Sequence, residues 1–166
     1  YDSTTGLPNR ASLANHLVRE LARSETDRHV FAVLYLEVAN HRDIPDNQAE
    51  EAIAALAKAV TTAVDDGTYL SRYSTSAFVL IVTNPAHHKY EDMYQRLRDL
   101  PRETDGGVTL ELRAGQSVFP NSGRNSRMLM KKAMETSELR KLGLASLKEE
   151  VKSADYFEAR SALPET

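Results

Sequence analysis

The stretch Thr5-Gly6-Leu7-Pro8-Asn9-Arg10 decides how this chain is interpreted, because it predicts a turn followed at once by a helix. Asn9 suits a helix cap, since its side-chain oxygen can accept a hydrogen bond from a backbone amide in the first turn. One face of the helix is then lined by Leu13, Leu17 and Leu21, at four-residue spacing. We therefore predict a helix over residues 10–23.

Further elements follow in a regular order. Residues 30–38 are branched or aromatic with little polar interruption, which is typical of a central strand buried on both faces. Two short strand-like runs separated by small polar residues predict a hairpin. The full predicted order is helix 10–23, strand 30–38, helix 48–64, hairpin strands 68–72 and 77–83, helix 90–97, strand 108–119 and helix 126–142.

The C-terminal third carries the least regular pattern. Gly115 is expected to mark a bulge or bend in the last long strand. The expected core residues of the last helix are Met128, Leu129, Ala133 and Leu139. Beyond residue 143 we expect a helical turn over 144–151, and Tyr156-Phe157 either begin a short edge strand or pack against the body.

The bulk properties limit the classes of function. With 166 residues the chain fits a single domain. Its net charge of −3 gives no overall attraction to nucleic acid or to an anionic membrane. The longest apolar stretch, residues 31–36, is far shorter than the roughly 20 residues that span a bilayer, and the chain has no cysteine. We expect a cytoplasmic segment that contacts neither membrane nor nucleic acid, from a parent protein that could be anchored in a membrane elsewhere.

The string from Thr5 to Arg10, and its distance from the predicted strand and hairpin, resemble the GGDEF family of bacterial domains. The order of elements matches as well. The resemblance covers residues 2–141 and implies an α/β (α+β) fold related to the palm of nucleotidyl cyclases and polymerases, in which helices wrap a central mixed five-stranded sheet. We treat residues 1–166 as a single domain, with 143–166 outside the clear resemblance and open to interpretation as a linker to a downstream domain.

Active members of that family condense two GTP molecules into cyclic di-GMP, and the family is named after a hairpin that binds metal and substrate. Divalent metal at such a site requires oxygen ligands, mainly carboxylates. The resemblance places one ligand at Glu37 and another in the hairpin, where this chain has Ala77. Glu37 is therefore a vestigial metal candidate, with a solvated charge at a strand end as the alternative, and we expect no complete metal site.

The hairpin departs from the family motif at four of five positions and retains Phe78, which we expect to fill the core. Ser74 and Thr75 replace two glycines, which would allow positive φ and a close approach to phosphate. Ser76 replaces an acid, and an unactivated hydroxyl is a poor base. We therefore predict a turn of altered shape and no catalytic residue among Ser74, Thr75, Ser76, Ala77 and Phe78.

The nucleotide contacts that the resemblance implies are also weakened. Pro45 stands where the family has a guanine-contacting asparagine, in a loop that is shorter than usual. Glu50 either stands in for a base-contacting aspartate or is only a favourable acid in the first turn of a helix. Arg42 and Lys141 fall at phosphate-contacting positions, with solvated surface charges as the alternative.

Active members are often restrained by an inhibitory product-binding site, arginine-x-x-aspartate, placed shortly before the hairpin. The corresponding stretch here is Asp65-Asp66-Gly67-Thr68, so Asp65 and Thr68 replace the required pair. Bidentate recognition of phosphate by arginine is then lost. We expect no inhibitory site.

Two polar features receive a structural interpretation. His87-His88 are adjacent and have no evident carboxylate partner, so we expect a polar loop and not a metal site. The basic residues of the chain are concentrated near its C-terminal third, and we expect them to form a solvated helix face, with a surface for phosphate or an acidic partner as the alternative. This basic concentration lacks the aromatic residues on which nucleic-acid bases stack. It comprises Arg124, Arg127, Lys131, Lys132, Arg140 and Lys141.

These observations predict a degenerate, catalytically inactive GGDEF domain that regulates or scaffolds a larger bacterial cyclic di-GMP signalling protein. By resemblance, its partners would be neighbouring sensory domains such as PAS, a downstream EAL phosphodiesterase-type domain, or a second copy in a homodimer. Two alternatives stay open: a GTP-binding sensor without turnover, and a diguanylate cyclase with residual activity. We expect no cofactor, since Mg²⁺ would accompany only residual nucleotide binding.

Overall fold

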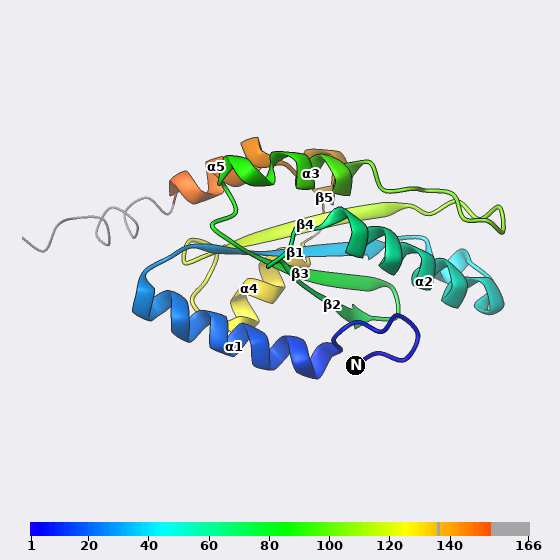
Figure 1. The fold of residues 1–166 in the computed structure, drawn as a ribbon, viewed down its shortest axis with the longest axis horizontal. Helices are drawn as coiled ribbons and strands as arrows, with labels where there is room; N and C mark the ends of the chain where they lie inside the picture. The colour runs from blue at the N-terminus through cyan, green and yellow to red at the C-terminus, as the bar shows by residue number, and fades with distance from the viewer. Residues whose placement is uncertain (136, 154–166) are drawn as a thin grey trace, which may run out of the picture.

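The computed structural model describes residues 1–135 and 137–153, and a five-stranded sheet forms its centre (Figure 1). The strands lie in the order β2-β3-β1-β4-β5. Their bounds are β1 Phe31–Val38, β2 Tyr69–Ser74, β3 Ala77–Thr83, β4 Leu112–Phe119 and β5 Ser137–Glu138. The α-helices are α1 Arg10–Asp27, α2 Asp46–Ala63, α3 Glu91–Arg98, α4 Ser126–Ala133 and α5 Leu144–Ser153, and short 3₁₀ helices occupy His41–Asp43, His88–Tyr90 and Leu139–Lys141.

Neighbouring strands in the sheet are antiparallel at every pairing. α2 carries the chain from β1 to β2, and α3 with the 3₁₀ helix His88–Tyr90 carries it from β3 to β4. Each of these crossovers passes one strand of the sheet, so two strands that run in the same direction are never neighbours. The elements from β1 to β4 thereby make a β-α-β-β-α-β arrangement. The predicted α+β fold with a helix-wrapped five-stranded sheet is confirmed, but the sheet is antiparallel and not mixed.

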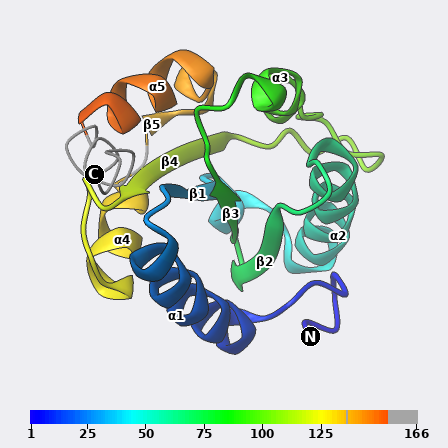
Figure 2. The same cartoon turned by 60° about the vertical axis from the view of Figure 1, so that its left-hand side comes forward.

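Helices cover both faces of the sheet (Figure 2). On one face, α2, α3 and α5 enclose a core that includes Leu34 of β1. On the other face, α1 and α4 enclose a second core that includes Val33 of the same strand. Successive side chains of a strand point to opposite faces, so a strand covered on both sides is apolar throughout. The central position predicted for residues 30–38 is confirmed. No helix within the described residues combines the length and the apolar character needed to cross a bilayer.

α1 begins where its sequence predicts, because the Asn9 side chain accepts a hydrogen bond from a first-turn amide at 2.9 Å. The helix continues to Asp27, beyond the predicted end at residue 23, and stops at Arg28, whose φ of 55° is left-handed. Glu20, 3% exposed, supports the additional turn through a contact of 3.0 Å with His29, which lies beyond the helix.

The bulge expected at Gly115 and the expected end of the last long helix are both wrong. Gly115 lies in unbroken register opposite Tyr35 and not at a bulge. Its role is to allow a close approach, because a Cβ atom there would lie 1.9 Å from the carbonyl oxygen of Ala133. α4 ends at Ala133 and not at residue 142, since the chain then turns back and pairs as β5 with Arg113 and Ala114.

The remaining differences are smaller. β4 starts later than the predicted residue 108, because the preceding segment forms an isolated bridge between Glu103 and Thr109. Met128 is 50% exposed, whereas the other predicted core residues of that region, Leu129, Ala133 and Leu139, are buried. The helical turn predicted over 144–151 is confirmed as part of α5. Tyr156-Phe157 lie outside the described residues.

Candidate functional site

The end of β1 and the start of β3 meet at the position of the predicted site. Glu37 is the direct partner of Ala77 in the antiparallel β1–β3 pairing. Side chains of directly opposite residues have Cβ atoms about 4.5–5.5 Å apart. Ala77 is 1% exposed, so a buried methyl group stands where a second carboxylate would face Glu37. The fold brings the two predicted positions together, and one of them has no metal-binding group.

These side chains do not fit a catalytic divalent cation. Mg²⁺ requires near-octahedral coordination by oxygen atoms, and a two-metal centre requires acids that ligate both ions. The Glu37–Ala77 pair supplies only the Glu37 carboxylate. Within residues 1–135 and 137–153, no group of three or more His, Cys, Asp or Glu side chains is placed to hold a metal ion.

Glu37 ends a series of aromatic contacts that begins on α1. The Arg10 guanidinium lies 4.2 Å from the centre of the Tyr73 ring and donates to its hydroxyl at 2.9 Å. Tyr73 in turn meets Tyr35 edge to face, with ring centres 5.9 Å apart. Burial, and then the neighbouring Glu37 carboxylate, raises the pKa of Tyr35 to about 12. The phenol therefore stays protonated at neutral pH and donates to Glu37 at 3.4 Å.

The hairpin turn does not depend on the glycines that the family motif would supply. Thr75 and Ser76 connect β2 to β3, and Phe78 just beyond them is fully buried. Positive φ among the described non-glycine residues is confined to Arg28 and Asn84. The turn at Thr75 and Ser76 is therefore made without the left-handed conformation that favours glycine.

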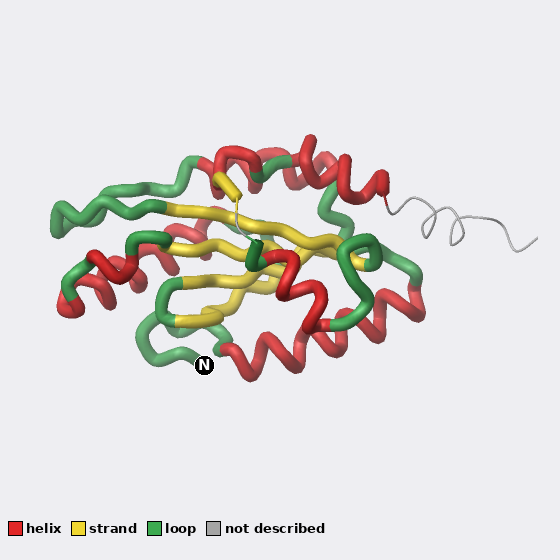
Figure 3. The backbone as a smooth tube through the Cα atoms, turned by 180° about the vertical axis from the view of Figure 1, so that it is seen from behind, coloured by secondary structure: helices red, strands yellow, loops and turns green. Residues whose placement is uncertain are grey.

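The turn is held by Arg72, which no local sequence pattern marks as a functional or structural residue. Its guanidinium donates to the carbonyl oxygens of Ser74 at 3.0 Å and Thr75 at 3.1 Å. It also pairs with Asp2, at 3.2 and 3.0 Å from the two carboxylate oxygens. The Arg72 amide donates to the carbonyl oxygen of Pro8 at 2.9 Å. These contacts join the N-terminal loop to the hairpin, beside which it lies in Figure 3.

This Asp2–Arg72 contact gives part of the N-terminal string a structural role. Asp2 accepts hydrogen bonds from the Thr5 amide at 2.9 Å and the Thr5 hydroxyl at 2.7 Å, and Gly6 takes a φ of 74°. Burial alone would raise the pKa of Asp2, but the hydrogen bonds from Thr5 and Arg72 together outweigh it and lower the pKa. The carboxylate is therefore held in its charged form.

The residues predicted to contact nucleotide do not converge on one pocket. A pocket of about 430 Å³ lies between the hairpin and the start of α2, and its lining includes Glu50, Asn47 and Thr75. Arg42 is exposed in the neighbouring 3₁₀ helix and lies outside this lining. Lys141 lines a different pocket, of about 280 Å³, beside β4 and β5. Glu50 alone of the three faces the pocket by the hairpin.

The stretch that the resemblance aligns with an inhibitory site makes structural contacts with α3 and the end of α2. The Asp65 carboxylate accepts a hydrogen bond from the Arg96 guanidinium at 2.7 Å, and Arg96 also donates to the Ala63 carbonyl oxygen at 2.8 Å. The Thr68 hydroxyl lies 3.6 Å from the Met93 sulfur. Asp65 thus presents a paired carboxylate where phosphate binding would need an arginine.

The adjacent histidines stack on each other, with ring centres 4.4 Å apart, and the His87 ring accepts a hydrogen bond from the Lys89 amide. His87 thus caps the 3₁₀ helix that begins at His88, so the predicted loop is a helix start at this point.

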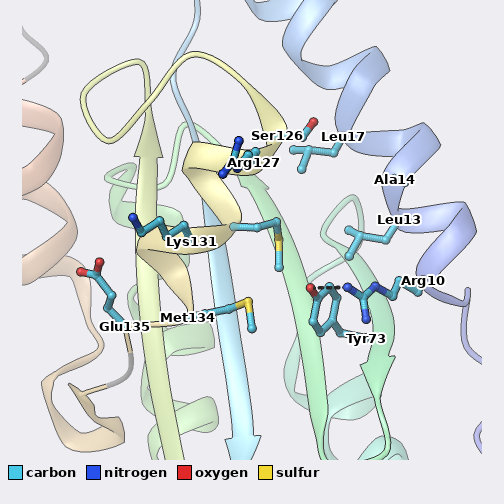
Figure 4. A pocket seen from close by; sticks show the side chains of 11 residues that line it. Arg10, Leu13, Ala14, Leu17, Tyr73, Ser126, Arg127, Lys131, Met134 and Glu135 are labelled. Carbon is cyan, nitrogen blue, oxygen red and sulfur yellow. Dashed lines mark hydrogen bonds between the residues drawn. The ribbon is translucent and has the colours of Figure 1, made fainter.

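The basic concentration is divided by the fold into separate surfaces. Lys132 pairs with Glu135 at 3.6 Å, and Lys141 faces the pocket beside β5. Arg127 and Lys131 instead lie on the rim of a pocket between α1 and α4, here called the α1–α4 groove (Figure 4). The predicted single helix face is therefore wrong, because α4 ends at Ala133.

A family model described as "Diguanylate cyclase, GGDEF domain" matches residues 1–142. The chain is 25% identical over 143 residues to the signaling protein YkoW of Bacillus subtilis, and 25% identical over 141 residues to the cyclic di-GMP phosphodiesterase NbdA of Pseudomonas aeruginosa. Each alignment covers 80% of this chain and 18% of the relative. The chain thus spans less than a fifth of the length of these curated relatives.

Solved structures share the fold. A sensory box/GGDEF family protein from Caulobacter crescentus matches with a TM-score of 0.66 and 23% sequence identity, over 90% of this chain and 97% of that chain. At this identity the match supports the architecture and not the chemistry.

Proposed function

Because this chain belongs to the GGDEF family, a family of cyclic di-GMP signalling proteins, we propose that it is a catalytically inactive member that regulates or scaffolds a longer signalling protein. The observation that carries this proposal is the pairing of Glu37 with Ala77. A methyl group cannot ligate a metal ion, and the Ser76 hydroxyl beside it cannot replace a catalytic acid or base.

The regulatory role is supported by the way the hairpin is held. Arg72 bonds the hairpin carbonyls and the N-terminal Asp2 with one guanidinium. A neighbouring sensory domain that displaced the N-terminal loop would therefore pull directly on the hairpin. The relatives are proteins of greater length, one of them called a cyclic di-GMP phosphodiesterase, which is the type of neighbour that such a domain would regulate.

A nucleotide sensor without turnover is the second candidate, and one observation favours it. The pocket of about 430 Å³ beside the hairpin has a volume suited to a small ligand and is lined by Glu50. The two cations assigned to the phosphates, Arg42 and Lys141, lie outside that lining. We therefore place the regulatory or scaffolding role first.

Catalysis is tested by incubating the domain with GTP and either Mg²⁺ or Mn²⁺ and measuring cyclic di-GMP by chromatography. We expect no product above that of heat-denatured protein. Steady product formation that disappears in Glu37→Ala would contradict the inactive assignment and support residual cyclase activity.

Regulation is tested in the full-length parent by substituting Arg72→Ala and measuring the output of the neighbouring catalytic domain. We expect the response to the input signal to change while the catalytic residues of that domain remain intact. An unchanged response would argue against signal transmission through the hairpin.

A further inference from the structure

The α1–α4 groove is a site that neither the family chemistry nor the proposed regulation uses. It has a volume of about 620 Å³, and its walls come from α1, α4 and the end of β2 (Figure 4). The walls are mainly apolar and include Leu13, Leu17, Met130, Met134 and the Tyr73 ring. Pockets of about 300–1,000 Å³ with such walls are typical of small-molecule sites. Methionine side chains add an adaptable surface.

The rim of the groove is positively charged. Arg10 lies on α1, Arg127 and Lys131 lie on α4, and Glu135 is the acid in the lining; Figure 4 shows the Lys131 side chain pointing away from α1. Glu135 already pairs with Lys132 at 3.6 Å. Arg10 is oriented by its hydrogen bond to Tyr73. Within the described residues, neither Arg127 nor Lys131 has a carboxylate within ion-pair distance.

These features together select a ligand with one apolar part and one negative charge. We propose that the α1–α4 groove binds a monomeric amphipathic carboxylate, such as a medium-chain fatty acid, with its chain between Leu17 and Met130 and its carboxylate near Arg127. α4 has eight residues and is about 12 Å long. A partner helix could therefore contact α4 over only about 12 Å, and the groove suits a single acyl chain better than a helix.

The first test is calorimetric titration of the domain with octanoate, decanoate and dodecanoate below their aggregation concentrations. We expect saturable binding of one molecule per domain. The affinity should rise about fourfold with each added methylene, because that is the gain expected when each methylene is fully buried. Decyltrimethylammonium, with the same chain and the opposite charge, should bind at least about tenfold more weakly than decanoate. No saturable binding of decanoate, or equal binding of the cation, would overturn the proposal.

The second test uses matched variants. Ala14→Trp fills the groove from an exposed position on α1 and should abolish decanoate binding. Val18→Trp is the control, because Val18 is 60% exposed on the same helix and outside the lining. Arg127→Glu should weaken binding about tenfold, whereas Lys58→Glu, the same change of charge on α2, should not alter it. Binding that survives Ala14→Trp would place the ligand elsewhere.

Two further probes distinguish the occupant. The wild type should not co-sediment with phosphatidylglycerol vesicles, and an acidic amphipathic peptide should fail to displace bound decanoate. Co-sedimentation that is lost in Ala14→Trp would assign the groove to a membrane surface, and displacement by the peptide would assign it to a protein partner. Either result would overturn the proposal of a free carboxylate ligand.

Discussion

Arg72 and Asp2 lie 70 positions apart in the chain and form an ion pair at 3.0 Å, with the Arg72 side chain 12% exposed and the Asp2 side chain 23% exposed. The same guanidinium bonds the carbonyl oxygens of Ser74 and Thr75. One side chain therefore connects the N-terminal loop to the turn between β2 and β3. In this protein the hairpin is a structural junction.

Removing this junction should destabilise the domain. Arg72→Ala leaves two carbonyl oxygens and a carboxylate without their donor, which should lower the free energy of unfolding by about 2–3 kcal/mol. Arg72→Lys should recover only part of the loss, because an ammonium cannot reproduce the planar fork of donors. Urea denaturation measures both values. Arg19→Ala, at an exposed position of α1, is the control and should change stability by less than about 0.5 kcal/mol.

The same ion pair predicts a pH dependence. The folded state lowers the pKa of Asp2 below its ordinary value of 3.8, so the charged carboxylate stabilises the fold above that pH. This contribution is lost as the pH falls through the lowered pKa of the folded state. The difference in unfolding free energy between wild type and Asp2→Asn should be constant near neutrality and shrink below about pH 3.8. A difference that grows on acidification would show that Asp2 is not held charged.

The sequence could predict what depends on local pattern. The Asn9 cap, the strand 30–38 buried on both faces and the order of elements follow from spacing and side-chain type, and the resemblance placed Glu37 and Ala77 at one site. The Asp2–Arg72 contact could not be found in this way, because no local pattern links residues so far apart.

The errors have a similar physical origin. Residues 126–142 carry helical spacing, yet α4 ends at Ala133, because pairing of Ser137–Glu138 with β4 competes successfully with continuation of the helix. Tertiary contacts override local propensity in such cases. A glycine within a strand pattern predicts a bulge or a bend at Gly115, because the sequence alone does not show that the end of a helix packs closely against this residue.

Placing a carboxylate at residue 77, where the family motif has one, should destabilise the folded domain. Ala77→Glu places a charge at a position that is 1% exposed and directly opposite Glu37. We expect a loss of about 2–4 kcal/mol in unfolding free energy, because the new charge is buried beside a like charge. Ala77→Gln, of similar size and no charge, should cost less. Thermal denaturation of Ala77→Glu with and without Mn²⁺ tests this reason. If Mn²⁺ restored the full stability of the variant, the wild type would be one ligand short of a cation site, and like-charge repulsion alone would not explain the loss.

Gly115 offers a test of the contact between α4 and β4. A Cβ atom at this position would lie 1.9 Å from the Ala133 carbonyl oxygen, so Gly115→Ala must push α4 away from the sheet. We expect a loss of about 2–4 kcal/mol, measured by urea denaturation. Gly106→Ala is the matched control, because its nearest neighbour would be a side-chain atom at 3.9 Å, an ordinary contact. Equal effects of the two substitutions would contradict the close packing seen here.

The last prediction separates nucleotide sensing from a purely regulatory role. Charge-assisted phosphate contacts contribute about 1.5–3 kcal/mol each, so removing two of them from a real GTP site should weaken binding by more than about a hundredfold. Arg42 and Lys141 lie outside the pocket that Glu50 lines, which leaves a triphosphate there without these cations. We therefore expect GTP with Mg²⁺ to give no saturable thermal stabilisation, and the Arg42→Ala, Lys141→Ala double variant to behave as the wild type does. A clear saturable shift in the wild type that is absent from the double variant would show that the two cations converge on bound nucleotide, and sensing would then replace scaffolding as the better account.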